Sequence, residues 1–176
     1  MRFIPLPLQG AFLIDLERNE DERGFFARSY CREEFTAHGL NPELVQSNIS
    51  YNFRRGTLRG MHYQRSPFEE AKVVRCTQGA LFDVIVDLRT GSSTFCRWYG
   101  AELTRENRLA LYVPEGLAHG FLTLASGTEV LYQMSTFYEP GAAAGVRWND
   151  PAFRIDWPGE VAVISERDNN YADFIP

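Results

Sequence analysis

Four side chains that could bind a polar ligand or transfer a proton lie within fourteen positions: Arg59, His62, Gln64 and Lys72. They occur in strand-like segments that also carry apolar residues, where a buried charge is costly unless it is paired or used on a ligand. A lone histidine in a sheet is more often a hydrogen-bonded core residue than a catalyst. Here the neighbouring charges favour a functional role, either in acid–base chemistry or in ligand binding.

The spacing of Arg59 and His62 bears on whether they can act together. They are three positions apart, so strict strand alternation points them to opposite faces of a sheet. Gly60 lies between them and can mark a β-bulge that turns both side chains into one cavity. The alternative is that Arg59 points into solvent.

The histidines give little support for a metal site. His38 ends a helix-like segment and is expected at the surface, whereas His119 lies between a turn and a strand. The segment after His62 reads Tyr-Gln rather than the His-x-His pair common in metal-binding barrels, and no two histidines are closely spaced. We therefore predict no metal. Phosphate-binding glycine loops and GxSxG are absent, so nucleotide hydrolysis and serine hydrolase chemistry have no support.

The elements that must position these residues are mostly short strands. Only residues 31–39 have helical character, and Gly39 is a suitable stop. Residues 80–88 alternate, with Leu81, Asp83, Ile85 and Asp87 on one face and apolar residues on the other. Further strand candidates are residues 98–103, 108–113, 120–125 and 129–134, separated by turn residues. This pattern predicts an all-β sandwich or barrel, with a jelly roll as the first choice and an interior pocket.

Length and composition bound the class of protein. The 176 residues are enough for one domain with a real core, so we expect a single domain over residues 1–176. The net charge of -5 differs from that of a basic nucleic-acid binder. Cys31, Cys76 and Cys96 form no CxxC pair and fit reduced thiols. With no signal-peptide or membrane-span pattern at the N-terminus, we expect a soluble cytoplasmic protein that binds neither membranes nor nucleic acids.

Eight motifs spread over nearly the whole chain occur in an order that resembles the dTDP-4-dehydrorhamnose 3,5-epimerase family of nucleotide-sugar enzymes. The most specific are LRGMHYQ (58–64), the lysine segment KVVRCTQGALFDVIVDLR (72–89) and PEGLAHGF (114–121). The resemblance implies a cupin-type jelly roll with short peripheral helices, a homodimer, and no metal or cofactor. It also implies inversion of stereocentres next to the C4 ketone of a nucleoside-diphosphate 4-keto-6-deoxy sugar, in deoxysugar or surface polysaccharide biosynthesis.

That chemistry explains the residue types. The ketone acidifies the neighbouring C–H groups, so inversion needs a base, an opposed acid and a group that stabilises the enolate oxygen. By resemblance, His62 is the base with Asp168 as its carboxylate partner, Lys72 stabilises the oxyanion, and Tyr132 is the opposed acid. Taken alone, Asp168 would be an exposed acid and Tyr132 a half-buried strand aromatic. The resemblance further implies substrate or nucleotide contacts from Arg23, Phe26, Arg28, Gln46, Asn48, Arg59, His119 and Tyr138.

Four positions depart from the usual family pattern, although the acid–base set is intact. Arg28 replaces a glutamate that helps to hold thymine, Glu70 replaces a glutamine, Gln133 replaces a lysine, and Asn169 replaces a basic residue. Arg28 can only donate hydrogen bonds, so if it faces the base it suits the acceptor edge of cytosine and a CDP-linked sugar. The alternative is that Arg28 points to solvent or pairs with an acid.

Other functions compete with this interpretation. A 3,4-ketoisomerase or a catalytically silent nucleotide-sugar binding module is possible on the same fold, although the complete acid–base set argues against both. Inversion at C3, at C5 or at both carbons is compatible with the motifs.

Overall fold

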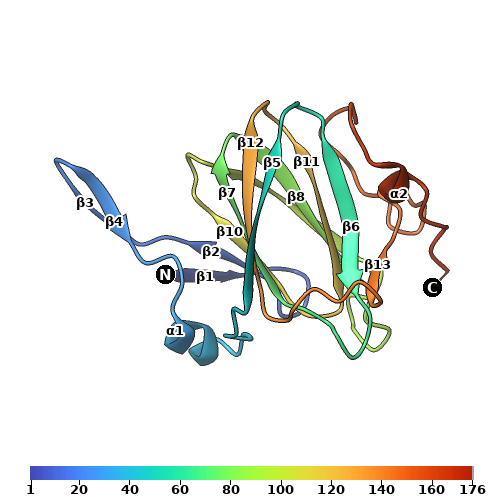
Figure 1. The fold of residues 1–176 in the computed structure, drawn as a ribbon. Coiled ribbons are helices and arrows are strands. Elements are labelled where there is room, and N and C mark those ends of the chain that lie inside the picture. Colours follow the sequence, from blue (N-terminus) through green and yellow to red (C-terminus); the bar gives the residue numbers. More distant parts are fainter. Residues whose placement is uncertain (176) are drawn as a thin grey trace.

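A computed structural model describes residues 1–175, in which two antiparallel sheets face each other (Figure 1). The larger sheet holds six strands in the order β1 (Arg2–Pro5), β2 (Phe12–Asp15), β10 (Ala110–Val113), β7 (Lys72–Gln78), β12 (Thr128–Met134) and β5 (Gln46–Asn52). The smaller sheet holds β13 (Ala143–Gly145), β6 (Leu58–Gln64), β11 (Leu117–Thr123), β8 (Ala80–Asp87) and β9 (Trp98–Thr104). The predicted jelly-roll arrangement of short strands is thus confirmed.

Three smaller elements lie outside the two sheets. The hairpin of β3 (Arg18–Asp21) and β4 (Gly24–Ala27) projects away from the body of the molecule (Figure 1). Helix α1 (Arg32–Ala37) falls within the segment predicted to be helical, and His38 caps it with an exposed side chain, as expected. Helix α2 (Glu166–Asn169) is one turn near the C-terminus, beside the smaller sheet.

The main core fills the space between the two sheets. Its buried residues come from facing strands, such as Val74 and Leu111 on one side and Ile85 and Phe121 on the other. The alternation predicted for residues 80–88 accounts for this, because Leu81 and Ile85 enter this core while Val84 and Val86 pack on the outer face. Both faces of the central strands are therefore buried.

The outer faces of the sheets are covered by the chain ends. Phe35 of helix α1 packs against Ile14 and Tyr112 outside the larger sheet. Phe153 and Trp157 of the C-terminal segment cover Met61 outside the smaller sheet. This covering brings helix α2 against β6, the strand that carries Arg59 and His62. Within residues 1–175, no helix is long and apolar enough to span a membrane.

Strand β11 corrects one sequence-based expectation. His119 was expected between a turn and a strand, but β11 begins two residues earlier, at Leu117. All seven of its residues are buried, and it pairs with β6 on one side and β8 on the other. Gly116, at the turn before the strand, has a φ of 81° and so fixes where the strand can start. His119 is therefore held by a central strand rather than by a loop.

Candidate active site

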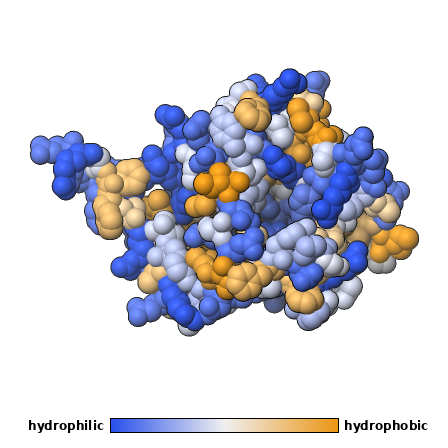
Figure 2. All heavy atoms as spheres, viewed as in Figure 1, coloured by the Kyte–Doolittle hydropathy of each residue, from blue (hydrophilic) through white to orange (hydrophobic). Residues whose placement is uncertain are grey.

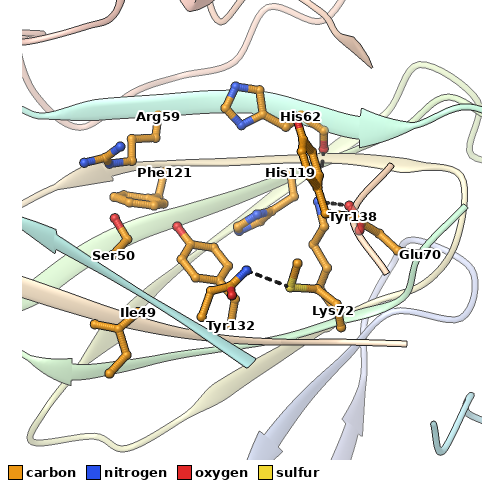
Figure 3. Close-up of a pocket in the computed structure, with 12 residues that line it drawn as sticks. Ile49, Ser50, Arg59, His62, Glu70, Lys72, His119, Phe121, Tyr132 and Tyr138 are labelled. Atoms are coloured by element: carbon orange, nitrogen blue, oxygen red, sulfur yellow. Dashed lines mark hydrogen bonds and ion pairs between the residues drawn. The ribbon is translucent and has the colours of Figure 1, made fainter. Parts of the chain in front are cut away.

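A cavity of about 280 Å³ opens between the two sheets (Figure 3). The smaller sheet contributes side chains from β6 and β11, and the larger sheet contributes side chains from β5, β7 and β12. Seven of the residues predicted to form the site line this cavity: Asn48, Arg59, His62, Lys72, His119, Tyr132 and Tyr138. The fold therefore gathers most of the predicted set, from positions 48 to 138, into one cavity.

A short polar contact in the site joins His62 to Asp168. Nε2 of His62 lies 2.7 Å from Oδ1 of Asp168, whose side chain is 7% exposed. The N-cap of helix α2, where Ser165 accepts from the backbone N–H of Asp168, fixes this carboxylate behind the histidine. Burial alone would raise the pKa of Asp168, but the hydrogen bond and charge of His62, with help from Gly60 and Ser165, hold it below its ordinary value. Asp168 is therefore a carboxylate at neutral pH.

A bulge in β6 turns Arg59 and His62 into the same cavity. His62 pairs with His119 and Arg59 pairs with Phe121. Between these two pairs β6 advances by three positions and β11 by only two, which is the register shift of a bulge. Gly60 lies in the bulge with a φ of 127°, and a Cβ there would lie 2.5 Å from the Cα of Gly120. The backbone N–H of Gly60 also donates to Asp168 over 3.1 Å. The predicted bulge is confirmed, and it both aims the histidine and binds its partner.

Lys72 carries a buried positive charge on the wall formed by the larger sheet. It is the first residue of β7, and its side chain is 9% exposed. Its Nζ lies 2.9 Å from Oε1 of Glu70 and donates to the backbone carbonyl of His62 over 3.4 Å (Figure 3). The ammonium group is thus held near His62, facing the cavity.

His119 forms a second, deeper pair. Its Nε2 lies 2.7 Å from Oδ1 of Asp83, a fully buried carboxyl on β8. Burial raises the pKa of Asp83, while the charges of His119 and Lys72 act in the opposite direction. Asp83 therefore fixes the orientation of the His119 ring at the floor of the cavity.

Tyr132 faces the cavity from the opposite sheet to His62. Its partly buried ring packs on the core and lies edge-on to His119 (Figure 3). Burial, with a further contribution from the carboxylate of Asp83, raises the pKa of Tyr132 well above its ordinary value. The phenol is therefore protonated at neutral pH and can only give up its proton to a strong base.

The comparisons with known proteins agree with this geometry. The family model described as dTDP-4-dehydrorhamnose 3,5-epimerase matches residues 5–175. The chain belongs to this family. The dTDP-4-dehydrorhamnose 3,5-epimerase of Methanothermobacter thermautotrophicus is 43% identical over 173 residues, which cover 97% of this chain and 92% of the relative.

Two further matches extend the comparison within the family. A dTDP-4-dehydrorhamnose 3-epimerase of Streptomyces niveus is 39% identical over 171 residues, covering 97% of this chain and 82% of the relative. The crystal structure of the dTDP-4-dehydrorhamnose 3,5-epimerase from Elizabethkingia anophelis has a TM-score of 0.95 and 40% identity, with coverage of 99% and 96%. This protein is thus a cupin-like isomerase that epimerises a deoxysugar.

In this family member, the residues at the cavity mouth are held less tightly than the central set. Arg59 is exposed, and its Nε donates to Oδ1 of Asn52 over 2.8 Å. Gln46 does not line the cavity itself, but its Oε1 accepts from the backbone N–H of Tyr138, which does. Gln64 was expected to face a ligand together with Arg59, His62 and Lys72. Its side-chain amide instead donates hydrogen bonds to the backbone carbonyls of two loops.

Three of the predicted binding residues lie away from this cavity. Arg23 and Phe26 belong to the projecting hairpin, where Arg23 pairs with Asp21 and its side chain is 84% exposed. Arg28 follows the hairpin, and its Nη1 lies 2.8 Å from Oε1 of Glu34. The pairing of Arg28 with an acid is the alternative that the sequence left open. A single copy of the chain therefore does not bring this group to its own cavity.

The structure adds two carboxyl groups that the sequence did not assign to the site. Asp83 pairs with His119, and Glu70 pairs with Lys72. For Asp83 a signal was present, because it is an acid placed between two apolar residues of the same strand face, Leu81 and Ile85. Among residues 1–175, no three histidine, cysteine, aspartate or glutamate side chains are grouped so that they could hold a metal ion.

Proposed function

We propose that this protein inverts C3, C5 or both in a dTDP-linked 4-keto-6-deoxyhexose, by proton transfer from the sugar to one side chain and back to the sugar from another. The observation that carries the proposal is the opposition of His62 and Tyr132 on facing sheets, with the ammonium of Lys72 reaching from the sheet of Tyr132 towards the strand of His62. Inversion of a carbon requires a base on one face of the sugar and an acid on the other. A cavity with one such group on each side supplies both.

His62 takes the proton from the carbon next to the ketone. Because Nε2 is engaged by Asp168, Nδ1 is the ring nitrogen that remains to accept a proton. The C–H bond breaks, its electron pair moves into the ring to form the enolate, and negative charge develops on the C4 oxygen. The carboxylate of Asp168 stabilises the imidazolium, while the ammonium of Lys72 stabilises the oxyanion.

Tyr132 then returns a proton to the opposite face. A C–H next to a ketone is a weaker acid than a phenol, so transfer from Tyr132 to the enolate carbon is downhill even though burial raises the pKa of the phenol. The new C–H bond forms as the enolate collapses to the ketone. His62 then releases its proton to solvent and Tyr132 regains one, which restores the starting state.

We propose thymine as the base that the protein prefers. The matched family model and the relatives above are named for dTDP-linked sugars. Arg28, the departure that pointed towards cytosine, is engaged by Glu34 rather than free to bind a base. Both considerations favour the dTDP-linked substrate over its CDP-linked counterpart.

We also propose a homodimer in which the hairpin of one copy completes the cavity of the other. Arg23 and Phe26 match family positions that bind the nucleotide, yet they lie away from the cavity of their own chain. The side chain of Phe26 is 76% exposed, and Figure 2 shows hydrophobic residues on the projecting hairpin and in the middle of the same face. Ile49, which lines the cavity, is 65% exposed, and Phe53, which follows β5, is 82% exposed. A second copy would cover these apolar groups.

Mixing two inactive variants tests the shared site. In a dimer of H62A and R23A chains, the R23A copy keeps an intact His62 and receives an intact hairpin. Random mixing should therefore restore roughly a quarter of the wild-type activity per chain, because half the dimers are mixed and each has one whole site. No recovery above the two parents would mean that each chain builds its whole site alone.

A panel of dTDP-, CDP- and GDP-linked 4-keto-6-deoxy sugars tests the substrate. Ring-proton NMR in deuterated buffer should show label and inversion with the dTDP-linked sugar at the lowest concentration. Preference for the CDP-linked sugar would contradict the proposed nucleotide. Carbonyl migration from C4 to C3 would identify a ketoisomerase, and tight binding without any label would identify a silent binding module.

A further inference from the structure

Glu70 is a carboxyl in the active site that the proposed proton transfers do not use. It lies at the wall of the cavity, beside the ammonium of Lys72, and its side chain is 7% exposed (Figure 3). Its Oε1 is 2.9 Å from Nζ of Lys72, whereas its Oε2 is buried and finds no partner among residues 1–175. Burying a carboxylate with one oxygen unpaired costs free energy. A role for its one contact, with Lys72, would account for that cost.

The backbone fixes Glu70 and Lys72 relative to each other. Glu70 lies two positions before Lys72, just ahead of β7, and their contact shows that both side chains point to the same side. The backbone N–H of Ala71 donates to Oγ of Ser135 over 2.8 Å, and the N–H of Ser135 donates to the carbonyl of Ala71. Thr136 bonds the carbonyl of the residue before Glu70. The carboxylate is thus attached to the same rigid pair of strands as the lysine, β7 and β12.

The geometry of the ammonium group shows what this contact achieves. An ammonium has three N–H donors that rotate freely on a flexible side chain. Glu70 takes one of them and the backbone carbonyl of His62 takes a second. With two donors bound, the position of Nζ and the direction of the third N–H are fixed. That third donor is the one left for an oxygen bound in the cavity.

We propose that Glu70 is a positioning residue, which holds the Lys72 ammonium so that its third N–H meets the C4 oxygen of the sugar. This inference rests on the role proposed above for Lys72. It assigns no proton transfer to Glu70 and no contact with the substrate, because the carboxylate acts only through the lysine. A glutamine at this position keeps an oxygen acceptor for Lys72, whereas an alanine removes it.

Ring-proton exchange by three variants tests the proposal, with wild type in the same assay. E70A should lower kcat for exchange by about 10²-fold, the order of loss expected when a catalytic group is misplaced by an ångström. KM and the Kd for dTDP should change less than threefold, because the proposed contact of Lys72 is with the sugar ketone rather than with the nucleotide. E70Q should recover most of the rate through its remaining acceptor. E69Q, which removes a neighbouring charge without a contact to Lys72, is the matched control.

The decisive comparison is made in the K72M background. If Glu70 acts through Lys72, E70A should cost nothing further once the lysine is gone. A full additional loss in K72M/E70A would show a merely structural role and overturn the proposal. So would exchange by E70A within threefold of wild type, or an E70Q as impaired as E70A. If wild type itself leaves the sugar unlabelled, the proposed function fails rather than the role of Glu70.

Discussion

Replacement of Asp168 by asparagine tests the histidine–carboxylate pair while keeping the shape of the side chain. The substitution removes the charge opposite Nε2 of His62, and asparagine still has an oxygen that can accept from the N–H of Gly60. The fold should therefore be retained. What is lost is the partner that stabilises the imidazolium after proton abstraction.

The distance between the two groups sets the size of the effect. Unit charges 2.7 Å apart attract by about 6 kcal/mol at an effective dielectric constant of about 20 and by about 1.5 kcal/mol in water. The Asp168 side chain is buried but that of His62 is 40% exposed, so screening by solvent favours an intermediate value of about 3 kcal/mol, or roughly a 10²-fold loss of rate. An asparagine N–H donated to Nε2 would also stabilise the tautomer with its proton on Nδ1, which blocks the base and adds to the loss.

Exchange of ring protons in deuterated buffer, followed by NMR, measures this loss. D168N should exchange about 10²-fold or more slowly than wild type, with a cooperative thermal unfolding transition retained and dTDP affinity within threefold. E166Q is the control, because Glu166 is an exposed acid in the same turn of helix α2. Exchange by D168N within threefold of wild type would refute the assignment of Asp168 as the partner of the base.

Three further predictions concern the acid, the metal and the fold. Y132F should still exchange label at the carbon that His62 deprotonates, but net inversion should fall much further, and equal losses of both would remove Tyr132 as the acid. Activity should survive dialysis against a chelator, and a loss restored by a divalent ion would contradict metal-free chemistry. Asp87 is buried, and burial alone would raise its pKa. Hydrogen bonds from Arg89, Ser92 and Thr94 outweigh this effect and hold the pKa of Asp87 far below its ordinary value. Its carboxylate therefore stabilises the fold above pH ~4, and this contribution is lost as the pH falls further. D87N should cost about 3 kcal/mol of unfolding free energy at pH 7 and much less at pH 2, as measured by denaturant unfolding; an equal cost at both pH values would contradict this.

Local patterns in the sequence were enough to predict most of the fold. Alternation over residues 80–88 predicted which side chains share a face of the sheet, and the glycine between Arg59 and His62 predicted the bulge that unites them. The start of β11 was misjudged, because the strand begins directly after Gly116 and not at residue 120. Such boundaries depend on pairing with distant strands, which no local window contains.

Site residues could be predicted where a polar side chain is conspicuous in an apolar strand. His62 and Lys72 stood out as polar groups in apolar strands, but their partners did not. The partner of His62 lies on a distant segment of the chain, and no local sequence pattern marks the partner of Lys72. Asp168 is 106 positions from His62 and meets it only because the C-terminal segment folds back over β6. Arg23, Phe26 and Arg28 show the opposite limit, since they lie away from the cavity of their own chain and only the proposed partner copy would give them a place in a site.

The most direct test of the account compares wild type with H62A on dTDP-4-keto-6-deoxyglucose in deuterated buffer. The account predicts that wild type introduces deuterium at C3, C5 or both with inversion. H62A should introduce label more slowly by roughly 10²-fold to 10⁴-fold while binding dTDP with nearly unchanged affinity. Label entering the sugar at a similar rate with H62A would contradict the proposed base, and a wild-type protein that binds the sugar without labelling it would contradict proton transfer as its function.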